Sequence, residues 1–111
     1  MKKRKKSSAF ERGRDAFANE NDLEDECCRV AFDEYGFLSL KQVAKKGLPD
    51  RVFFRDGYAF FVEFKDTGKD AEPYQKHIHK KLRDVGMYVY VIDSLNDFVE
   101  ACNEQSRRIR T

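Results

Sequence analysis

The sequence predicts a single α/β domain, with a mixed central sheet flanked by helices on both faces. An Asp56-Gly57 pair between two apolar runs indicates a β-hairpin. Apolar residues recur with helical spacing before and after this hairpin, and the apolar run 87–92 is typical of a central buried strand. At 111 residues, 41% of them hydrophobic, the chain is long enough for one modest core.

The first helix is expected from about residue 19 to residue 35, where Gly36 is placed to end it. Four apolar residues form its inner stripe: Leu23, Cys27, Val30 and Ala31. On a helical projection, Glu20 and Glu24 also fall inside the buried arc. An acid on a core face is unusual, although the stem of such a glutamate can pack while its head reaches water. A short strand is expected next, around 37–43.

The hairpin then places two acids side by side. A two-residue loop fixes the pairing register, so Arg55 lies opposite Tyr58 and Asp50 falls opposite Glu63, with Cβ atoms roughly 4.5–5.5 Å apart. A divalent cation between the carboxylates would offset their repulsion, and Mg²⁺ is usually bound by one or two carboxylates with water and phosphate. Lys65 projects from the same face as Glu63, where its ammonium can hold a water or a developing negative charge.

A second helix is expected from Pro73 to about Val85, after a polar loop. Its predicted core stripe is Tyr74, Ile78, Leu82 and Val85. Gln75 lies beside this stripe near the helix N-terminus, where it can reach a phosphate or a bound water. His77 and His79 point about 200° apart and cannot share one ion.

The last helix is expected to begin after Ser94 and to end near Asn103. Its inner stripe is predicted to contain four residues: Leu95, Phe98, Val99 and Cys102. The run before it, residues 87–92, is the predicted central strand.

These motifs carry a family resemblance. The segment Gly47-Leu48-Pro49-Asp50-Arg51, then Phe61-Val62-Glu63-Phe64-Lys65, then Gln75, Leu82 and the run 86–92 resemble the virus-type replication-repair nuclease domain, VRR-NUC, of the PD-(D/E)xK nuclease superfamily. The resemblance covers about Leu23 to Phe98. It implies a restriction-endonuclease-like core and Mg²⁺- or Mn²⁺-dependent hydrolysis of DNA phosphodiesters. Stand-alone members of this size are similar to Holliday junction resolvases that work as homodimers.

The resemblance also implies roles for single residues. The implied catalytic set is Asp50, Glu63, Lys65, Gln75 and a helix glutamate, for which Glu24 is the first choice and Glu20 the second. The implied metal ligands are Asp50, Glu63 and the backbone carbonyl of Phe64. The candidate DNA contacts are Lys41, Arg51, Lys69, Lys76 and His79. Each of these lysines also fits a solvated surface, and His79 also fits an ordinary, partly exposed histidine.

Charge is segregated along the chain, although the net charge is only +2. Residues 1–18 are expected to form a basic, flexible arm, 19–105 the nuclease-like domain and 106–111 a basic tail. Such an arm can release counterions from a phosphate backbone, but a solvated tail or a nuclear-import signal has the same composition.

Composition indicates a cytoplasmic protein rather than a secreted or membrane protein. No apolar run approaches the length of a membrane span, and no apolar stretch follows the basic start as in a signal peptide. The three cysteines are odd in number, and the adjacent Cys27 and Cys28 would form a strained bridge. Reduced thiols are therefore expected.

Three functions remain open at this point. The first is a structure-specific DNA endonuclease that acts on branched or flapped DNA as a homodimer. The second is a general or restriction-type nuclease on the same scaffold. The third is a non-catalytic DNA-binding module, against which the intact set of Asp50, Glu63 and Lys65 argues. Four residues are expected to contribute to a dimer interface: Phe32, Tyr35, Phe37 and Leu38.

Overall fold

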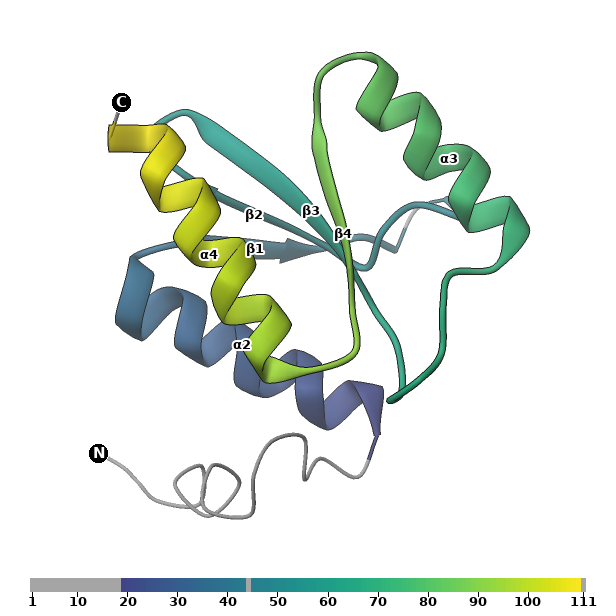
Figure 1. The fold of residues 1–111 in the computed structure, drawn as a ribbon, viewed down its shortest axis with the longest axis horizontal. Coiled ribbons are helices and arrows are strands. Elements are labelled where there is room, and N and C mark those ends of the chain that lie inside the picture. The colour runs from purple at the N-terminus through teal and green to yellow at the C-terminus, as the bar shows by residue number, and fades with distance from the viewer. Residues whose placement is uncertain (1–18, 44, 111) are drawn as a thin grey trace.

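The computed structural model describes residues 19–43 and 45–110, which form a mixed α/β fold (Figure 1). The sheet has the order β1-β2-β3-β4, with antiparallel pairing between the first three strands and parallel pairing between β3 and β4. The elements are α2 (Glu20–Tyr35), β1 (Leu38–Lys41), β2 (Arg51–Arg55), β3 (Tyr58–Phe64), α3 (Pro73–Asp84), β4 (Tyr88–Ile92) and α4 (Leu95–Arg110). The predicted arm, residues 1–18, lies outside the described residues.

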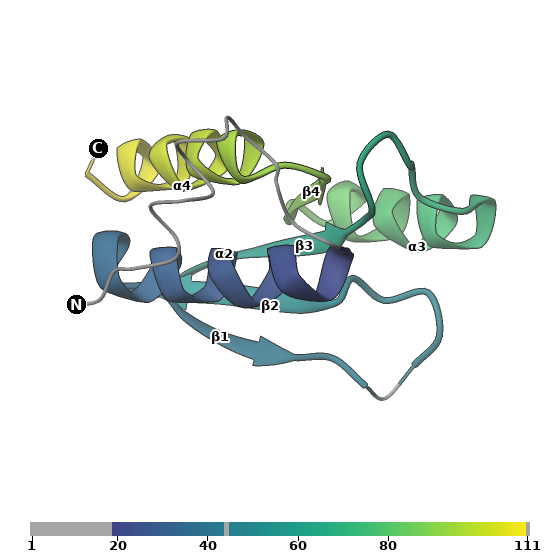
Figure 2. The ribbon, with the colours of Figure 1, turned by 90° about the horizontal axis from the view of Figure 1, so that it is seen from below.

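The sheet is flanked by helices, as the sequence predicts. Figures 1 and 2 show α2 and α4 on the same side of the molecule, and α3 set apart from them beside β4. The side chains of β3 alternate between the two faces: Phe60, Val62 and Phe64 belong to the core with α2 and α4, whereas Glu63 contacts α3. No helix in the described ranges is long and apolar enough to cross a membrane.

The first helix has the predicted bounds because both of its ends are capped. The side chain of Asn19 accepts hydrogen bonds from the backbone N–H groups of Asn21 and Asp22. Gly36 follows the helix with φ of 77°, a left-handed conformation that favours glycine.

The predicted register of the hairpin is confirmed. Arg55 pairs with Tyr58, Val52 with Phe61, and Arg51 with Val62. The loop residues Asp56 and Gly57 have φ of 54° and 82°, as a two-residue hairpin turn of this kind requires. The Asp-Gly pair therefore fixes which residues of the two strands share a face.

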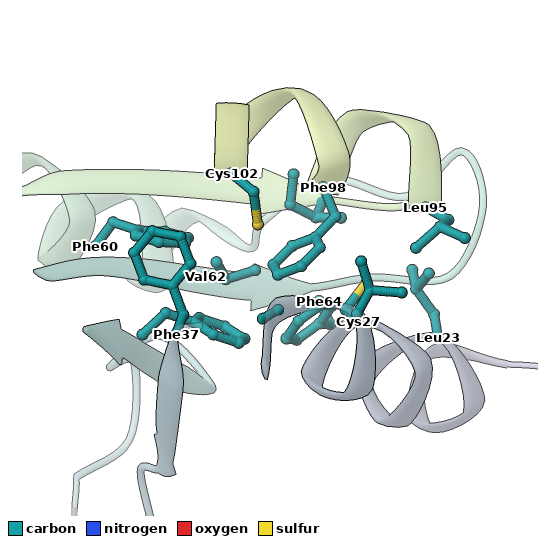
Figure 3. Close-up of a cluster of buried hydrophobic side chains, with 13 residues drawn as sticks. Leu23, Cys27, Phe37, Phe60, Val62, Phe64, Leu95, Phe98 and Cys102 are labelled. Atoms are coloured by element: carbon teal, nitrogen blue, oxygen red, sulfur yellow. The ribbon is translucent and has the colours of Figure 1, made fainter. Parts of the chain in front are cut away.

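Aromatic side chains dominate the core between the sheet and the α2–α4 layer (Figure 3). The rings of Phe53 and Phe60 stack with centroids 5.3 Å apart, and Phe98 of α4 lies 5.2 Å from Phe53. Leu23 and Cys27 of α2 complete this layer, and both are buried. Because the apolar face of β3 is committed to this core, Glu63 must face the other way.

Two predictions about the C-terminal half are wrong. Residues 88–92 of this run form β4, which is an edge strand in the sheet of the described residues rather than a central one. Both α3 and α4 contact this strand, so its residues can be apolar although it is an edge strand. An apolar run alone does not distinguish such a strand from a central one. The predicted core stripe of α3 is wrong at both ends, because Tyr74 is 46% and Val85 75% exposed, whereas Ile78 and Leu82 are partly buried. The residue that α3 buries is His79.

The last helix is longer than predicted. It continues past Asn103 to Arg110, so residues 106–110 belong to α4 and not to a separate tail. Gln105 and Ser106 are buried in this added part, and the amide nitrogen of Gln105 donates to the hydroxyl of Tyr90 at 2.9 Å.

Candidate active site

The two carboxylates meet at the end of the hairpin away from its turn. Arg51 pairs with Val62, so the preceding residue, Asp50, comes next to Glu63. The carboxylate of Asp50 also accepts a hydrogen bond from the backbone N–H of Phe64 at 2.8 Å. This bond fastens the loop before β2 to the end of β3 and fixes the position of Asp50.

Burial dominates the electrostatics of Asp50. It raises the pKa of the Asp50 carboxyl to about 6, from an ordinary value of 3.8. The hydrogen bond from Phe64 lowers this pKa, whereas the negative charge of Glu63 raises it. A cation bound between the two carboxylates would remove the repulsion that Glu63 exerts on the charge of Asp50.

Glu63 is only 3% exposed and is surrounded by three side chains. One carboxylate oxygen, Oε2, accepts from the amide nitrogen of Gln75 at 2.9 Å and lies 3.7 Å from Nζ of Lys65. The other, Oε1, lies 3.8 Å from Nε2 of His79. In the described part of the chain, neither Oε1 nor this Nε2 has a hydrogen-bond partner. A buried carboxylate oxygen without a partner is costly, and a ligand would satisfy it.

Gln75 is oriented by the start of α3. Its side-chain oxygen accepts from the backbone N–H of Glu72 at 2.8 Å, which turns its NH₂ group toward Glu63. The predicted position of Gln75 near the helix N-terminus is therefore confirmed. Its contact, however, is with the carboxylate of Glu63, and its predicted contact with a phosphate or water stays a prediction.

The expectation of a partly exposed His79 is wrong. The residue is 1% exposed, because α3 packs this side of the helix onto the end of β3. A buried imidazole cannot reach a DNA phosphate at the surface. The neighbour of the His79 ring in the structure is the carboxylate of Glu63. The signal in the sequence was the four-residue spacing of Gln75 and His79, which places both on one helix face.

Glu24 is the buried acid of the first helix, at 4% exposed, whereas Glu20 is partly exposed. The Oε2 atom of Glu24 accepts hydrogen bonds from Nζ of Lys41 at 2.9 Å and from Nε of Arg51 at 2.5 Å. Glu24 thus anchors two predicted DNA contacts at the end of the sheet, and its charge contributes to the raised pKa of Asp50. A catalytic role for Glu24 stays a prediction.

The remaining predicted DNA contacts, Lys69 and Lys76, are both exposed. Nζ of Lys76 lies 3.1 Å from the carboxylate of Asp70. A backbone hydrogen bond from Ala71 and this lysine together lower the pKa of Asp70. Lys69 lies in the loop between β3 and α3.

A comparison with known proteins identifies a relative among phage proteins. The chain is 34% identical over 87 residues to "Putative nuclease p44" of Acyrthosiphon pisum secondary endosymbiont phage 1. The chain belongs to the same family as this phage protein. The similar region spans 76% of this chain and 90% of the relative. No family model matches the sequence.

The site combines residues from four parts of the chain. Asp50 comes from the loop before β2, Glu63 from β3, Lys65 from the residue after β3, and Gln75 and His79 from α3. Among the described residues, no three His, Cys, Asp or Glu side chains gather as a complete metal cage. Two carboxylates are nevertheless what Mg²⁺ usually takes from a protein, with water and phosphate as its other ligands.

Proposed function

We propose that this protein is a Mg²⁺- or Mn²⁺-dependent DNA endonuclease of the VRR-NUC type, with a PD-(D/E)xK core. The observation that carries the proposal is the pair of Asp50 and Glu63 at one end of the hairpin, with the ammonium of Lys65 3.7 Å from Glu63. The phage relative, which is named a nuclease, supports the same chemistry.

The residues fit a hard divalent cation. Their donors are carboxylate oxygens, and Oε1 of Glu63 is buried without a hydrogen-bond partner in the described residues. Asp50, Glu63 and the backbone carbonyl of Phe64 would hold the ion. When bound, such an ion polarises a phosphoryl oxygen and lowers the pKa of a water molecule.

The other side chains act on charge and position. We expect the ammonium of Lys65 to orient the attacking water and to offset negative charge on the pentacovalent phosphorus. Gln75 donates to Glu63 and keeps that carboxylate in one orientation. Glu24 forms ion pairs with Lys41 and Arg51 at the same end of the sheet as Asp50. Their positive charges there favour the binding of a phosphate backbone.

The preferred substrate is branched or flapped DNA. We expect shape and backbone charge to select it, because phosphate contacts position a protein without reading bases. The test is a panel of four-way junction, flap, duplex and single-stranded DNA, each with Mg²⁺, Mn²⁺ or EDTA. Cleavage of junction or flap is expected with either metal, at least tenfold faster than cleavage of duplex, and none with EDTA.

Other results of this panel would change the proposal. Equal cleavage of all four substrates would favour a general nuclease. Cleavage that persists in EDTA would overturn the metal-dependent mechanism. Binding of junctions without cleavage under any metal would favour the non-catalytic module.

We further propose that the protein acts as a homodimer through the region around β1. Exposed apolar residues lie on both sides of β1: Leu38 and Leu40 point away from α2, because Ser39 and Lys41 contact that helix, while Phe32 lies near the end of α2 and Val43 follows β1. Two residues predicted for this interface do not fit, because Phe37 is buried at 1% exposed and Tyr35 packs partly against the core. In the sheet of the described residues β1 is also an edge strand, and no other described strand pairs with its outer side.

Leu40→Lys is therefore expected to shift the protein from dimer to monomer. Leu40 is 60% exposed, so a lysine fits the folded monomer but would be buried in a dimer. Val85→Lys is the matched control, since Val85 is 75% exposed at the far end of α3. Sedimentation at micromolar protein measures the effect. A wild type that sediments only as a 13.1 kDa species would contradict the dimer.

A further inference from the structure

One exposed aromatic ring belongs to the helix turn that contacts the carboxylate cluster. Tyr74 is in the first turn of α3 and is 46% exposed. The next residue, Gln75, donates its amide hydrogen bond to Glu63. The ring of Tyr74 is thus attached to the same turn of helix that holds a candidate metal ligand in place.

The loop that carries Asp50 packs directly against this ring. A Cβ built on Gly47 would lie 3.5 Å from Cδ2 of Tyr74 and 3.0 Å from Cγ1 of Ile78. Gly47 also has φ of 93°, so glycine is favoured here both by space and by backbone conformation. The position of the ring is therefore fixed by both elements that build the site, the loop leading to Asp50 and the start of α3.

A cation accompanies the ring. Nζ of Lys46 lies 4.9 Å from the centroid of Tyr74, within the range of a cation–π contact. Lys46 is exposed, so its ammonium remains accessible to a phosphate. A half-exposed aromatic ring with an adjacent ammonium is the combination that proteins use to bind unpaired nucleotides, stacking the base on the ring and pairing the phosphate with the cation.

We propose that Tyr74 stacks on an unpaired nucleobase beside the scissile phosphate, while Lys46 binds a neighbouring phosphate. This inference rests on the proposed nuclease function and defines its substrate class as nucleic acid with an unpaired nucleotide at the cut. In continuous duplex both faces of each base are covered by its neighbours, so the ring gains a stacking partner only at a flap, gap or branch point.

The alternative is that Tyr74 only packs the loop against α3. Tyr74→Leu separates the two roles, because leucine keeps an apolar contact with Gly47 and Ile78 but offers no aromatic face. Tyr74→Trp keeps the face. Tyr58→Leu is the matched control: Tyr58 is 36% exposed and has the guanidinium of Arg108 5.2 Å from its ring, but it lies at the opposite end of β3 from Glu63.

The experiment measures binding to two DNA substrates, a flap with 2-aminopurine as its first unpaired base and a fully paired duplex of equal length. Ca²⁺ replaces Mg²⁺, and gels verify that the DNA stays uncut. The wild type is expected to quench the 2-aminopurine fluorescence. Tyr74→Leu should no longer quench the fluorescence, and its affinity for the flap should fall about tenfold. Its affinity for duplex should change less than twofold. Tyr74→Trp and Tyr58→Leu should behave like the wild type.

Unchanged flap binding and quenching by Tyr74→Leu would overturn the inference, and so would an equal loss of affinity for both substrates. Thermal melting of each variant confirms that it is folded. The proposed nuclease function is judged separately, by Mg²⁺-dependent cleavage by the wild type. A protein that cleaves normally but binds without Tyr74 refutes only the stacking. A protein that never cleaves, yet loses flap binding in Tyr74→Leu, refutes only the nuclease.

Discussion

Asp50→Asn is expected to lower metal-dependent cleavage by about 1,000-fold or more, while the folded protein becomes more stable. The variant replaces a charged metal ligand with a neutral amide, which removes transition-state stabilisation that depends on the bound ion. The amide oxygen can still accept the hydrogen bond from the backbone of Phe64, so the loop before β2 should keep its place. DNA binding is expected to remain.

The gain in stability follows from the raised pKa of Asp50, about 6 in the folded state against 3.8 ordinarily. Between these values the folded protein holds a proton that the unfolded chain has lost, so the free energy of unfolding falls as the pH rises. The loss is complete once the pH is well above the folded-state pKa of about 6. For a half-exposed group we expect it to reach about 1 kcal/mol, after allowance for solvent screening. Asp50→Asn avoids this loss.

Denaturant unfolding between pH 4 and pH 7, without divalent metal, measures the difference. The stability of the variant relative to the wild type should grow as the pH rises from 4 through about 6 and should level off towards pH 7. Asp25→Asn, on the exposed side of α2, is the matched control for the loss of one carboxylate outside the site. Added Mg²⁺ should stabilise only the wild type. An active Asp50→Asn variant would exclude Asp50 as an essential ligand.

The pH dependence of activity has the same origin. Metal binding requires the ionised carboxylate, so cleavage at limiting Mg²⁺ should decline as the pH falls through about 6. Saturating Mg²⁺ should move this decline to lower pH, because the ion competes with the proton. These two profiles can be recorded on one junction substrate.

The predictable part of the site is the part that local chemistry determines. The turn at Asp56 and Gly57 specifies loop length, loop length specifies register, and register brings Asp50 to Glu63. No tertiary contact enters this chain of reasoning. Helical periodicity likewise predicted Glu24 as a buried acid, although it placed Glu20 in the same arc and Glu20 is partly exposed.

The contacts of α3 depend on tertiary packing and were not predictable in the same way. Its apolar residues suggest a broad core stripe, but the helix covers only the β3–β4 side of the sheet and leaves Tyr74 and Val85 exposed. The same packing buries His79 against Glu63. Helical periodicity gives the faces of a helix, but it does not tell how much of a face its neighbours cover.

The end of α4 shows a related limit. Its last turns contain Arg107, Arg108 and Arg110, which suggest a solvated tail. The helix continues because the side chain of Gln105 is buried and donates a hydrogen bond to the hydroxyl of Tyr90 in β4. A polar residue that is buried through one specific hydrogen bond gives no signal in a hydrophobic pattern.

Lys65→Ala is expected to lower the cleavage rate by about 100- to 1,000-fold without weakening metal binding. The ammonium of Lys65 lies 3.7 Å from Glu63 and its side chain is only 14% exposed, so its charge acts at close range within the site. Removing a positive charge beside a cation site lowers electrostatic repulsion, so the affinity for Mg²⁺ should stay equal or rise. This separates Lys65 from Asp50, whose loss should reduce both quantities.

Single-turnover cleavage measures the rate, and the Mg²⁺-dependent rise in melting temperature reports metal binding. Lys65→Arg should recover part of the rate, because it keeps the positive charge but changes its shape. Lys69→Ala, in the exposed loop after β3, is the control and should alter DNA affinity rather than the single-turnover rate at saturating protein. If Lys65→Ala lost metal binding together with activity, Lys65 would hold the carboxylates in place rather than act on the water or the phosphate.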